Sequence, residues 1–475
     1  MHFNFDILPK VHDEARQGEV YAIDKQPFEQ SKSRQRTFYI ESYGCAMNFS
    51  DSEIIASIMR KEGFAATPDF LDADLVMINT CSIRENAEQR VRQRLREFKK
   101  VKKRNPEALI AVLGCMAERL KSRFLEEEKI VDIVVGPDAY RDLPVLVARA
   151  DQGQKAVNVL LSREETYADI SPVRLNGNGV SAFISIMRGC NNMCSFCVVP
   201  FTRGRERSRN PESIINEAAK LFEDGYREIT LLGQNVDSYS HHNAQTGSQV
   251  NFAQLLAGVA KVDPLLRIRF STSHPKDITD DVLFTIAEHK NICKNIHLPV
   301  QSGSTNVLKR MNRTYSREWY LNKIDSIRRI IPNCGISTDI ITGFCGETES
   351  EHKETLSIMD YVKYDFAFMF MYSERPGTLA AKKFEDDVPT SVKSRRLAEI
   401  VAAQSNHQLT NNTKEIANEY EVLSEGFSKK SDQHLFGRTS HNKVVIFPKK
   451  HFNKGDYVKA KVVGFTSATL MGEVI

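Results

Sequence analysis

Short apolar runs alternate with amphipathic segments through the first third of the chain. Four of these runs have the length of buried strands, at residues 37–44, 73–80, 108–114 and 131–136. Between them, residues 51–63 and 85–104 repeat their apolar positions with helical spacing. Near-continuous apolar strands that alternate with helices are typical of a parallel sheet covered on both faces. The pattern predicts an α/β domain with a doubly wound parallel sheet over residues 35–151.

A second alternating series follows a polar linker and covers the middle of the chain. Its strand runs occupy residues 182–189, 227–233, 266–272, 295–301, 336–343 and 366–372. Helical segments lie between them, as at 211–225, where Pro211 suits the first helical turn. Six strand–helix units fit a partial (β/α)6 barrel better than a flat sheet. We therefore predict a barrel domain over residues 176–408, ending in a helix at 389–408.

The two ends of the chain differ from these domains. Alternating apolar and polar residues predict short strands at 442–448, 456–465 and 468–475, separated by turns rich in Gly and Lys. This pattern predicts a small C-terminal all-β barrel over residues 409–475. Residues 1–34 mix charges without periodicity, and we expect them to form a loosely ordered N-terminal arm.

Composition narrows the class of protein. The chain has 475 residues, of which 41% are hydrophobic and 27% charged, which suits packed cores and excludes a disordered or collagen-like chain. No apolar run approaches the roughly 18–20 residues of a membrane span, and residues 1–34 lack the pattern of a signal peptide. We expect a soluble, cytoplasmic protein without a membrane partner.

The distribution of charge along the chain indicates two segments that could bind a partner. The net charge of +4 is small, but residues 90–104 hold nine Lys or Arg and one acid. Such a run forms either a solvated helix face or a nucleic-acid binding surface. A second basic segment, residues 429–459, lies within the predicted β-barrel.

Three cysteines lie within eight residues, directly after the first predicted barrel strand. They are Cys190, Cys194 and Cys197, in the order Cys-x3-Cys-x2-Cys. Thiolates select soft centres such as zinc, copper(I) or iron–sulfur. A structural zinc site would need a fourth ligand, and no second Cys-x2-Cys pair follows. Three ligands would leave one iron of a 4Fe–4S cubane open for substrate, whereas three ordinary buried thiols are the alternative.

A second triplet is dispersed along the first domain. Cys45, Cys81 and Cys115 each lie just past the carboxyl end of a predicted strand. Open α/β sheets bind ligands along that edge, so three converging thiols could hold a second cluster. The alternative is that each is a small buried apolar residue. We interpret the remaining three cysteines as non-ligands: Cys293, Cys334 and Cys345.

Longer motifs around these cysteines resemble a known family. The Cys-x3-Cys-x2-Cys loop after the first strand of a partial barrel resembles the radical S-adenosylmethionine (SAM) superfamily. Within it, the chain resembles the methylthiotransferases through the segments YGCAMNFSDSE, INTCSIRENAEQRV, LGCMAERL, GCNNMCSFCVVPFTRGRERSR, LLGQNV, STSHP, HLPVQSGS and DIITGF. The C-terminal β-barrel resembles the RNA-binding TRAM module of that family. The motifs span nearly the whole chain.

The resemblance implies an enzyme with two 4Fe–4S clusters, one on each cysteine triplet. The cluster on the barrel triplet would bind SAM, which would serve as methyl donor and radical source, and the other would be auxiliary. CSIRENAEQRV resembles the branch that methylthiolates carbon 2 of isopentenyladenosine adjacent to the tRNA anticodon. The implied partners are this tRNA anticodon stem-loop and a reductant such as flavodoxin or ferredoxin, and we expect a monomer.

Rival hypotheses concern the substrate and the class of protein. Related branches of the family modify a ribosomal protein or threonylcarbamoyladenosine tRNA. A hypothesis from another class is a non-enzymatic protein that binds zinc through the barrel triplet and RNA through the β-tail.

Polar residues at the carboxyl ends of barrel strands are candidate SAM contacts. Four lie at or just past strand ends, namely Gln234, Ser271, Gln301 and Asp339. Tyr372 and Ser373 follow the last strand and resemble an adenine-contacting position of the family. Ordinary capping of strand ends is the alternative role for the first four.

Two further features follow from the same motifs. Arginines alternate after the barrel cysteines, and we expect them to contact phosphates or to cover a surface: Arg203, Arg205, Arg207 and Arg209. Cys345 stands where the family usually has Pro, and it lacks the fixed φ of proline.

Overall fold

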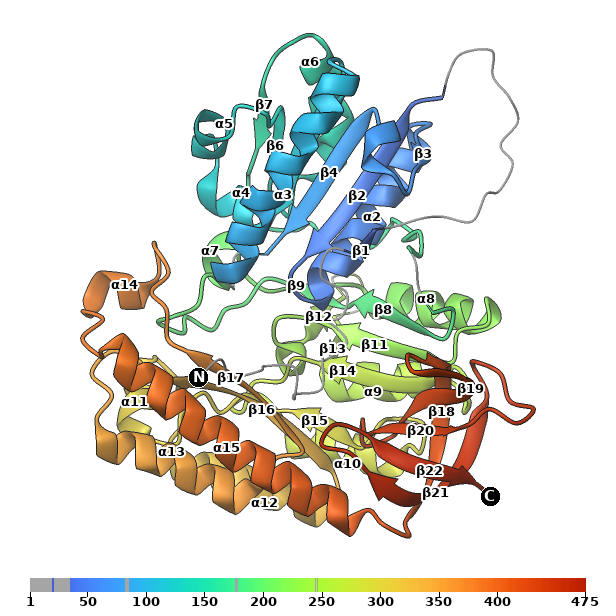
Figure 1. Cartoon of the computed structure of the whole chain (residues 1–475), viewed down its shortest axis with the longest axis vertical. Coiled ribbons are helices and arrows are strands. Elements are labelled where there is room, and N and C mark those ends of the chain that lie inside the picture. The colour runs from blue at the N-terminus through green and yellow to red at the C-terminus, as the bar shows by residue number, and fades with distance from the viewer. Residues whose placement is uncertain (1–18, 21–34, 82–84, 176–177, 244, 246) are drawn as a thin grey trace.

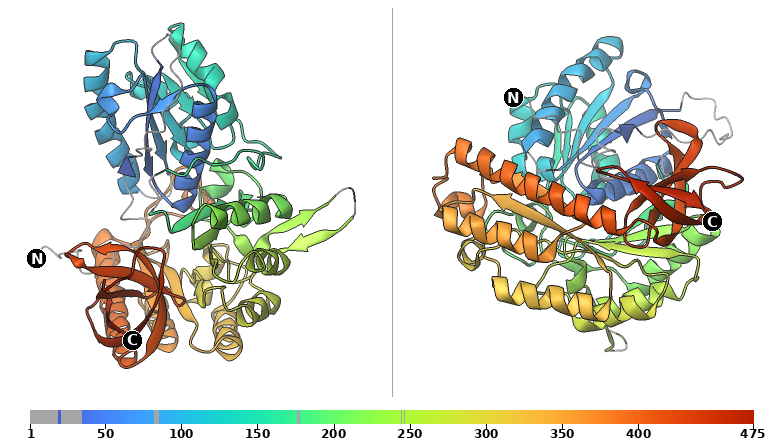
Figure 2. Two further views of the ribbon diagram at one scale, coloured as in Figure 1. Left: turned by 90° about the vertical axis from the view of Figure 1, so that its right-hand side faces the viewer. Right: turned by 60° about the horizontal axis from the view of Figure 1, so that its bottom comes forward.

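The computed structural model describes residues 19–20, 35–81, 85–175, 178–243, 245 and 247–475. Figure 1 shows an α/β domain in blue and cyan, a central body of strands and helices in green to orange, and a small β-barrel in red. The α/β domain and the red barrel pack against different sides of the central body (Figure 2). The predicted fold class is confirmed. Apart from residues 19–20, the expected N-terminal arm lies outside the described residues.

The first domain is built on a seven-stranded sheet. Its strands are β1 (Glu19–Val20), β2 (Thr37–Tyr43), β3 (Ala65–Ala66), β4 (Leu75–Thr80), β5 (Leu109–Gly114), β6 (Ile133–Val135) and β7 (Ala156–Asn158). The order is β1-β2-β4-β5-β6-β7, with β3 also on β2, and every pair except β1–β2 is parallel. The chain leaves β2 for β3 on one side and then returns to β4 on the other. The sheet is therefore doubly wound, with its switch point between β2 and β4.

Helices cover both faces of this sheet. They are α2 (Ala46–Lys61) and α6 (Leu143–Asp151) on one face, and α3 (Glu85–Arg104), α4 (Cys115–Leu120) and α5 (Arg123–Glu127) on the other. Every residue of β4 and β5 is buried, which explains why their sequences are apolar without alternation.

The central body contains six parallel strands in two sheets. These are β8 (Ser181–Ser185), β11 (Glu228–Leu232) and β14 (Arg267–Ser271), and then β15 (Asn295–His297), β16 (Gly335–Thr342) and β17 (Phe366–Met371). A parallel bridge between Ile268, on β14, and Ile292, just before β15, joins the two sheets. The described strands β8 and β17 form the two outer edges, so the barrel is partial, as predicted.

Helices surround the partial barrel. They are α7 (Val199–Thr202), α8 (Pro211–Glu223), α9 (Phe252–Ala260), α10 (Asp280–Glu288), α11 (Thr305–Arg310), α12 (Arg317–Ile330), α13 (Glu349–Val362), α14 (Leu379–Lys383) and α15 (Thr390–Lys414). Short 3-10 turns lie at η2 (Phe70–Asp72), η3 (Tyr140–Asp142) and η4 (Val236–Ser238). Two small antiparallel pairs were not predicted: β9 (Met187–Arg188) with β10 (Arg207–Ser208), and β12 (Ser240–His242) with β13 (Gln249–Asn251).

The C-terminal strands form a closed five-stranded barrel in the order β18-β19-β20-β22-β21. They are β18 (Glu419–Ser428), β19 (Ser431–Thr439), β20 (Val444–Pro448), β21 (Tyr457–Phe465) and β22 (Leu470–Val474). The sequence pattern did not predict the first two strands, because only part of each strand is buried. Arg267 Nη1 donates to Arg438 O (2.6 Å) and Arg269 Nη2 to Thr439 O (2.8 Å), which docks this barrel on β14.

None of the described helices combines the length and the apolar character that crossing a membrane requires.

Candidate functional site: two cysteine triplets facing one cavity

The register of the first sheet brings the dispersed cysteines to one edge. Tyr43 pairs with Thr80, and Thr80 pairs with Gly114, so the residues that follow them lie side by side. Cys81 and Cys115 come directly after the paired positions, and Cys45 comes one residue later. This edge contains the switch point between β2 and β4, where ligands of open α/β sheets bind.

Glycine permits this close approach. Gly44 has a φ of +142°, and a Cβ added to it would lie 2.4 Å from Cys81 Cβ. A side chain at Gly44 would therefore clash with Cys81 in addition to straining the backbone. Asn48 ties the segments together because its Nδ2 donates to Thr80 O (3.0 Å) and to Asn79 Oδ1 (3.1 Å). Helix α2 begins directly after Cys45, whose Sγ lies 3.4 Å from Asn48 Oδ1.

The barrel cysteines lie on a loop between β9 and α7. Cys190 and Cys194 are buried, and Cys197 N donates to Cys194 O (3.0 Å) in a tight turn. Burial raises the pKa of Cys190 and of Cys197 to about 12 each. The charge of Glu206 adds to the rise at Cys190, and the neighbouring Cys194 adds to the rise at Cys197. Arg313 Nη1 donates to Cys194 Sγ (3.2 Å). A buried cation thus faces this triplet and would offset the charge of its thiolates.

The central body supplies a similar cation to Cys115 of the α/β domain. Arg203, which follows α7 in the central body, donates through Nε to Cys115 Sγ (3.2 Å). Burial raises the pKa of Cys115, and Arg203 opposes that rise. The two triplets therefore share a feature, an arginine that donates to one thiol.

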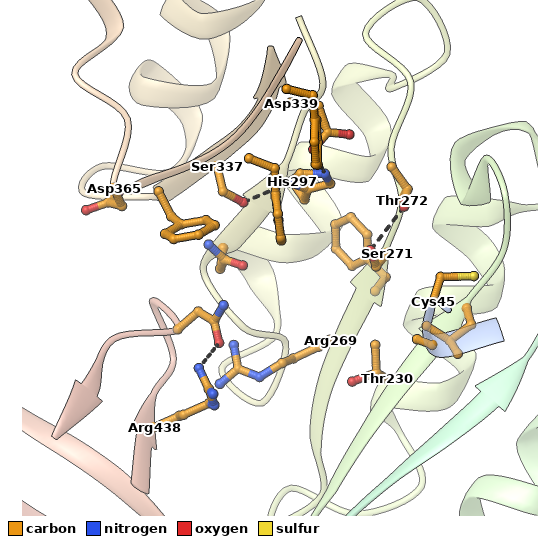
Figure 3. A pocket seen from close by; sticks show the side chains of 18 of the residues that line it. Cys45, Thr230, Arg269, Ser271, Thr272, His297, Ser337, Asp339, Asp365 and Arg438 are labelled. Carbon is orange, nitrogen blue, oxygen red and sulfur yellow. Dashed lines mark hydrogen bonds and ion pairs between the residues drawn. The ribbon is translucent and has the colours of Figure 1, made fainter. Parts of the chain in front are cut away.

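Both triplets border one cavity of about 1160 Å³. Cys45 lines it from the α/β domain and Cys197 from the barrel, while Arg438 and Lys443 line it from the C-terminal barrel. Figure 3 shows Cys45 at one side of this space and Arg438 at another, with barrel side chains between them. All three domains therefore contribute residues to the lining of one cavity.

Five of the six predicted SAM contacts line this cavity: Ser271, Gln301, Asp339, Tyr372 and Ser373. Gln234 is not among its lining residues. Gln301 is held in place by backbone bonds to its neighbour strand, since Gln301 N donates to Asp339 O (2.9 Å). Its φ of +67° places it in the left-handed region.

The sequence did not predict several of the residues that line the cavity. His297, on β15, faces two polar side chains of the neighbouring strand β16, with Nδ1 3.0 Å from Ser337 Oγ and Nε2 3.5 Å from Asp339 Oδ1. Aromatic rings of β17 form one wall, namely Phe366, Phe368 and Phe370. The ring centroid of Phe368 lies 4.9 Å from that of Phe366 and 5.6 Å from that of His297. The three Phe residues occupy every second position of β17, and side chains at such positions point to the same face of a strand. This spacing could have predicted the aromatic wall.

The arginines after the barrel cysteines do not behave as predicted. Three are buried in ion pairs: Arg203 Nη2 lies 2.8 Å from Asp51 Oδ2, Arg207 Nη1 lies 2.9 Å from Asp138 Oδ2, and Arg209 pairs with Glu217. They neither cover a surface nor lie open to phosphates, because partners from this chain already bind them. Of the four, Arg205 alone is exposed.

Arg203 and Arg207 join two domains, whereas Arg209 binds Glu217 within the central body. Asp51, on α2, accepts from Arg203 and also from Arg188 Nη1 (2.7 Å), and all three side chains are buried. Burial by itself would raise the pKa of Asp51, but Arg188 and Arg203 outweigh it and lower this pKa. The carboxylate therefore stays charged, and the ion pairs hold the α/β domain on the central body.

The other three cysteines lie outside both triplets. Cys345 is buried in an apolar cluster with Phe344 and Tyr372, against which Phe196 of the barrel cysteine loop also packs. Cys293 is buried near Arg269, whose charge opposes the rise in its pKa that burial causes. Their interpretation as non-ligands stays a prediction.

The basic segment 90–104 forms helix α3, and acidic neighbours bind part of its charge. Arg92 pairs with Glu88, Glu127 and Glu128, and Lys102 Nζ lies 2.8 Å from Asp132 Oδ2. The exposed lysines of this helix are Lys99, Lys100 and Lys103. Arg90 reaches the edge of the cavity.

Models of three families match this chain. Residues 37–136 match the Uncharacterized protein family UPF0004, residues 184–359 the Radical SAM superfamily, and residues 414–475 the TRAM domain. The chain is 63% identical over 449 residues to the tRNA-2-methylthio-N(6)-dimethylallyladenosine synthase of Amoebophilus asiaticus, and the alignment covers 92% of each. It is 56% identical over 480 residues to the synthase of that name from Christiangramia forsetii, covering 98% of this chain and 99% of the relative. This chain belongs to the same synthase family.

Solved structures agree on the fold. The radical SAM methyltransferase TsrM from Kitasatospora setae has a TM-score of 0.53 at 14% identity and covers 74% of this chain and 75% of its own. Membership of the radical SAM superfamily implies a 4Fe–4S cluster and SAM. The TRAM domain and the tRNA-modifying relatives of this synthase family support binding of tRNA.

Proposed function

We propose that this chain transfers a methylthio group to carbon 2 of the dimethylallyladenosine (isopentenyladenosine) adjacent to the tRNA anticodon. Synthase relatives at 52–63% identity carry the name of this reaction. The observation that carries the proposal is the cavity, because thiols of two separate triplets, Cys45 and Cys197, line the same space. A reaction that joins a radical source with a sulfur donor needs both beside one substrate.

The residues present fit two iron–sulfur clusters. Each triplet offers three soft thiols, and each has an arginine nitrogen 3.2 Å from one of them, which compensates negative charge in a buried place. Within the described residues, no three Cys, His, Asp or Glu side chains surround a single ion. A 4Fe–4S cluster would not need three thiols around one ion, because it carries about four irons.

We assign one 4Fe–4S cluster to Cys190, Cys194 and Cys197 and a second, auxiliary cluster to Cys45, Cys81 and Cys115. When bound, the first cluster with SAM supplies the radical chemistry that opens an unactivated aromatic C–H bond, and the second supplies sulfur. A reactive radical requires a site from which water is excluded, and residues of all three domains line the cavity in which it would form. Polar side chains for SAM are Ser271, Gln301 and Asp339, with Tyr372 and Ser373 near its adenine.

The aromatic wall of the cavity suits the target nucleoside. Phe366, Phe368 and Phe370 present ring faces and edges on which an unstacked adenine and its apolar dimethylallyl group can pack. Arg438 and Lys443 lie on the side of the cavity formed by the TRAM domain, where they can bind the phosphates of the flanking nucleotides. A target base turned out of the anticodon loop would thus reach both clusters.

The remaining partners follow from the chemistry. Reductive cleavage of SAM needs an electron, and a flavodoxin or ferredoxin is the proposed donor. We further propose a monomeric, cytoplasmic enzyme that binds the anticodon stem-loop of its tRNA.

Two measurements test this function. Anaerobically reconstituted protein should contain about eight irons and eight sulfides, since each cubane carries about four of each. Incubation with SAM, a reductant and tRNA that carries dimethylallyladenosine should yield a methylthiolated nucleoside detectable by mass spectrometry. A chain that binds about one zinc, or that modifies a ribosomal protein while leaving this tRNA unchanged, would contradict the proposal.

A further inference from the structure

Arg203 differs from Arg188 and Arg207, which also bind acids across the domain contact, because it binds a thiol as well. It belongs to the central body, yet Nε donates to Cys115 Sγ (3.2 Å) and Nη2 donates to Asp51 Oδ2 (2.8 Å), both in the α/β domain. Its side chain is almost fully buried, with 2% of the residue exposed. One guanidinium therefore binds a cysteine of the dispersed triplet and the acid that fastens the domains together.

The third nitrogen of Arg203 has no acceptor of its own. Nη1 is buried and lacks a hydrogen-bond partner among the described residues. A buried donor without an acceptor is costly, so such a group usually indicates an acceptor that protein atoms do not provide. The adjacent thiol identifies the missing acceptor by its chemistry as an anionic sulfur centre.

Arg313, beside the barrel triplet, has a hydrogen-bond acceptor for each nitrogen of its guanidinium. Nη1 donates to Cys194 Sγ (3.2 Å), Nε to Tyr315 Oη (3.0 Å) and Nη2 to Pro299 O (3.0 Å). All of these partners lie in the central body, and each nitrogen of the guanidinium is used.

Arg188 and Arg207 also bind across the domain boundary, and the Nε of each is likewise buried without a hydrogen-bond partner among the described residues, but neither donates to a thiol. What distinguishes Arg203 is an available donor beside a cysteine of the dispersed triplet.

We propose that Arg203 is a positioning residue for the auxiliary cluster: it donates to the Cys115 ligand and, through Nη1, to a sulfur of the bound cluster. This inference rests on the proposed function, since it requires a cluster on the dispersed triplet. Hydrogen bonds to cluster sulfurs stabilise the more negative, reduced state and so raise the reduction potential. Docking of the central body thereby sets the electronic state of a cluster held by its neighbour.

Asp51 supplies the opposing charge in this arrangement. It accepts from Arg188 and Arg203, so its carboxylate fixes the guanidinium of Arg203 in front of Cys115. Its negative charge also lies near the proposed cluster and disfavours the reduced state. Arg203 and Asp51 should therefore shift the potential of this cluster in opposite directions when each is neutralised or weakened.

The test is a redox titration of full-length, anaerobically reconstituted protein, followed by EPR. SAM is added to perturb the signal of the barrel cluster and so separate it from the auxiliary one. The Arg203→Lys variant keeps the positive charge but loses the planar set of guanidinium N–H donors. We expect about eight irons per chain and, at a fixed potential, a ratio of reduced to oxidised auxiliary cluster about tenfold lower, which is about 59 mV for a one-electron couple. The barrel cluster should keep its potential.

Arg207→Lys is the matched control. Arg207 is likewise buried, binds Asp138 across the same domain contact at 2.9 Å and 3.0 Å, and has a buried Nε without a partner among the described residues, but it donates to oxygen atoms and to no thiol. We expect it to weaken docking of the domains without moving either potential. If Arg207→Lys shifts the auxiliary potential as much as Arg203→Lys does, the effect comes from docking and the inference is wrong.

A second variant decides the matter if Arg203→Lys does not fold. Arg203→Gln removes the guanidinium and its positive charge, so we expect the auxiliary potential to become more negative. An unchanged potential with full iron in either variant would overturn the inference while leaving the two-cluster proposal intact. A wild-type content of about four irons would instead overturn both.

Discussion

The two cysteine triplets reach the same cavity by opposite routes. In the central body, Cys190, Cys194 and Cys197 share one loop, and Cys197 N even donates to Cys194 O. In the α/β domain, whole strand–helix units separate the three thiols, and only the register of β2, β4 and β5 brings them together. The first triplet is thus fixed by local geometry, whereas the second depends on an entire sheet.

Their arginines extend this contrast. Arg313 and its partners all belong to the central body, so the barrel triplet carries its own compensating charge. The α/β domain receives Arg203 only when the central body docks on it. The first site is therefore complete within one domain, and the second is completed by a neighbour. This difference indicates that domain docking controls the second site but not the first.

Removal of one ligand from each triplet should have the largest effect. Cys81→Ala should lose the auxiliary cluster and so contain about half the wild-type iron, because each cubane carries about four irons. It should still cleave SAM to 5′-deoxyadenosine but make no methylthiolated tRNA. Cys194→Ala should do the reverse, with loss of SAM cleavage and retention of the auxiliary cluster.

Cys293→Ala is the control for these variants, because Cys293 is equally buried and belongs to neither triplet. It should keep all of the iron and the product. Full iron content and normal methylthiolation in Cys81→Ala would show that the dispersed thiols are structural.

Breaking the domain contact should cost the most stability. Arg188 is buried and binds Asp51 Oδ1 (2.7 Å), so Arg188→Met leaves a buried carboxylate with one fewer partner. We expect the free energy of unfolding to fall by about 3–5 kcal/mol, measured by urea denaturation. The comparison is Arg36→Ala, which breaks the half-exposed pair with Asp151 and should cost no more than about 1 kcal/mol. Equal losses would mean that the buried pairs do not hold the domains.

The surroundings of the dispersed triplet should respond to pH. Burial raises the pKa of Glu118, on the helix that begins at Cys115, to about 7 from its ordinary value of 4.5. The fold therefore prefers the protonated form, and this stabilisation is complete below about pH 4.5 and lost as the pH rises through about 7. In Glu118→Gln the thermal midpoint should lose this part of its pH dependence, whereas Glu126→Gln, at an exposed position, should keep it.

The smallest effect should come from the basic helix beside the dispersed triplet. Replacing Lys99, Lys100 and Lys103 by Ala should weaken tRNA binding and flatten the slope of log affinity against log salt by up to about 0.9 per lost phosphate contact. Lys102→Ala is the control, since Asp132 already binds that lysine. If the triple variant keeps the wild-type slope, α3 is only a solvated face.

Local patterns determined most of the architecture. Continuous apolar strands predicted the α/β domain, and six strand–helix units predicted the partial barrel. The spacing of Cys190, Cys194 and Cys197 was enough to propose a site from the sequence. The positions of Cys45, Cys81 and Cys115 after strands also sufficed to infer a common edge, because parallel strands end on one side. These features depend on neighbours in the chain, which a sequence displays directly.

The tertiary structure alone decided which polar side chains meet. Nothing in the sequence distinguishes Arg203, which binds Cys115 and Asp51, from the exposed Arg205 two residues later. Likewise, Gln234 lies at a strand end as predicted but does not line the cavity, while His297 and Phe368 do. A buried charge is stable only where a partner from a distant segment meets it, and the docking of the domains determines that meeting. For this reason the sequence located the thiols, and the fold located the arginines that face them.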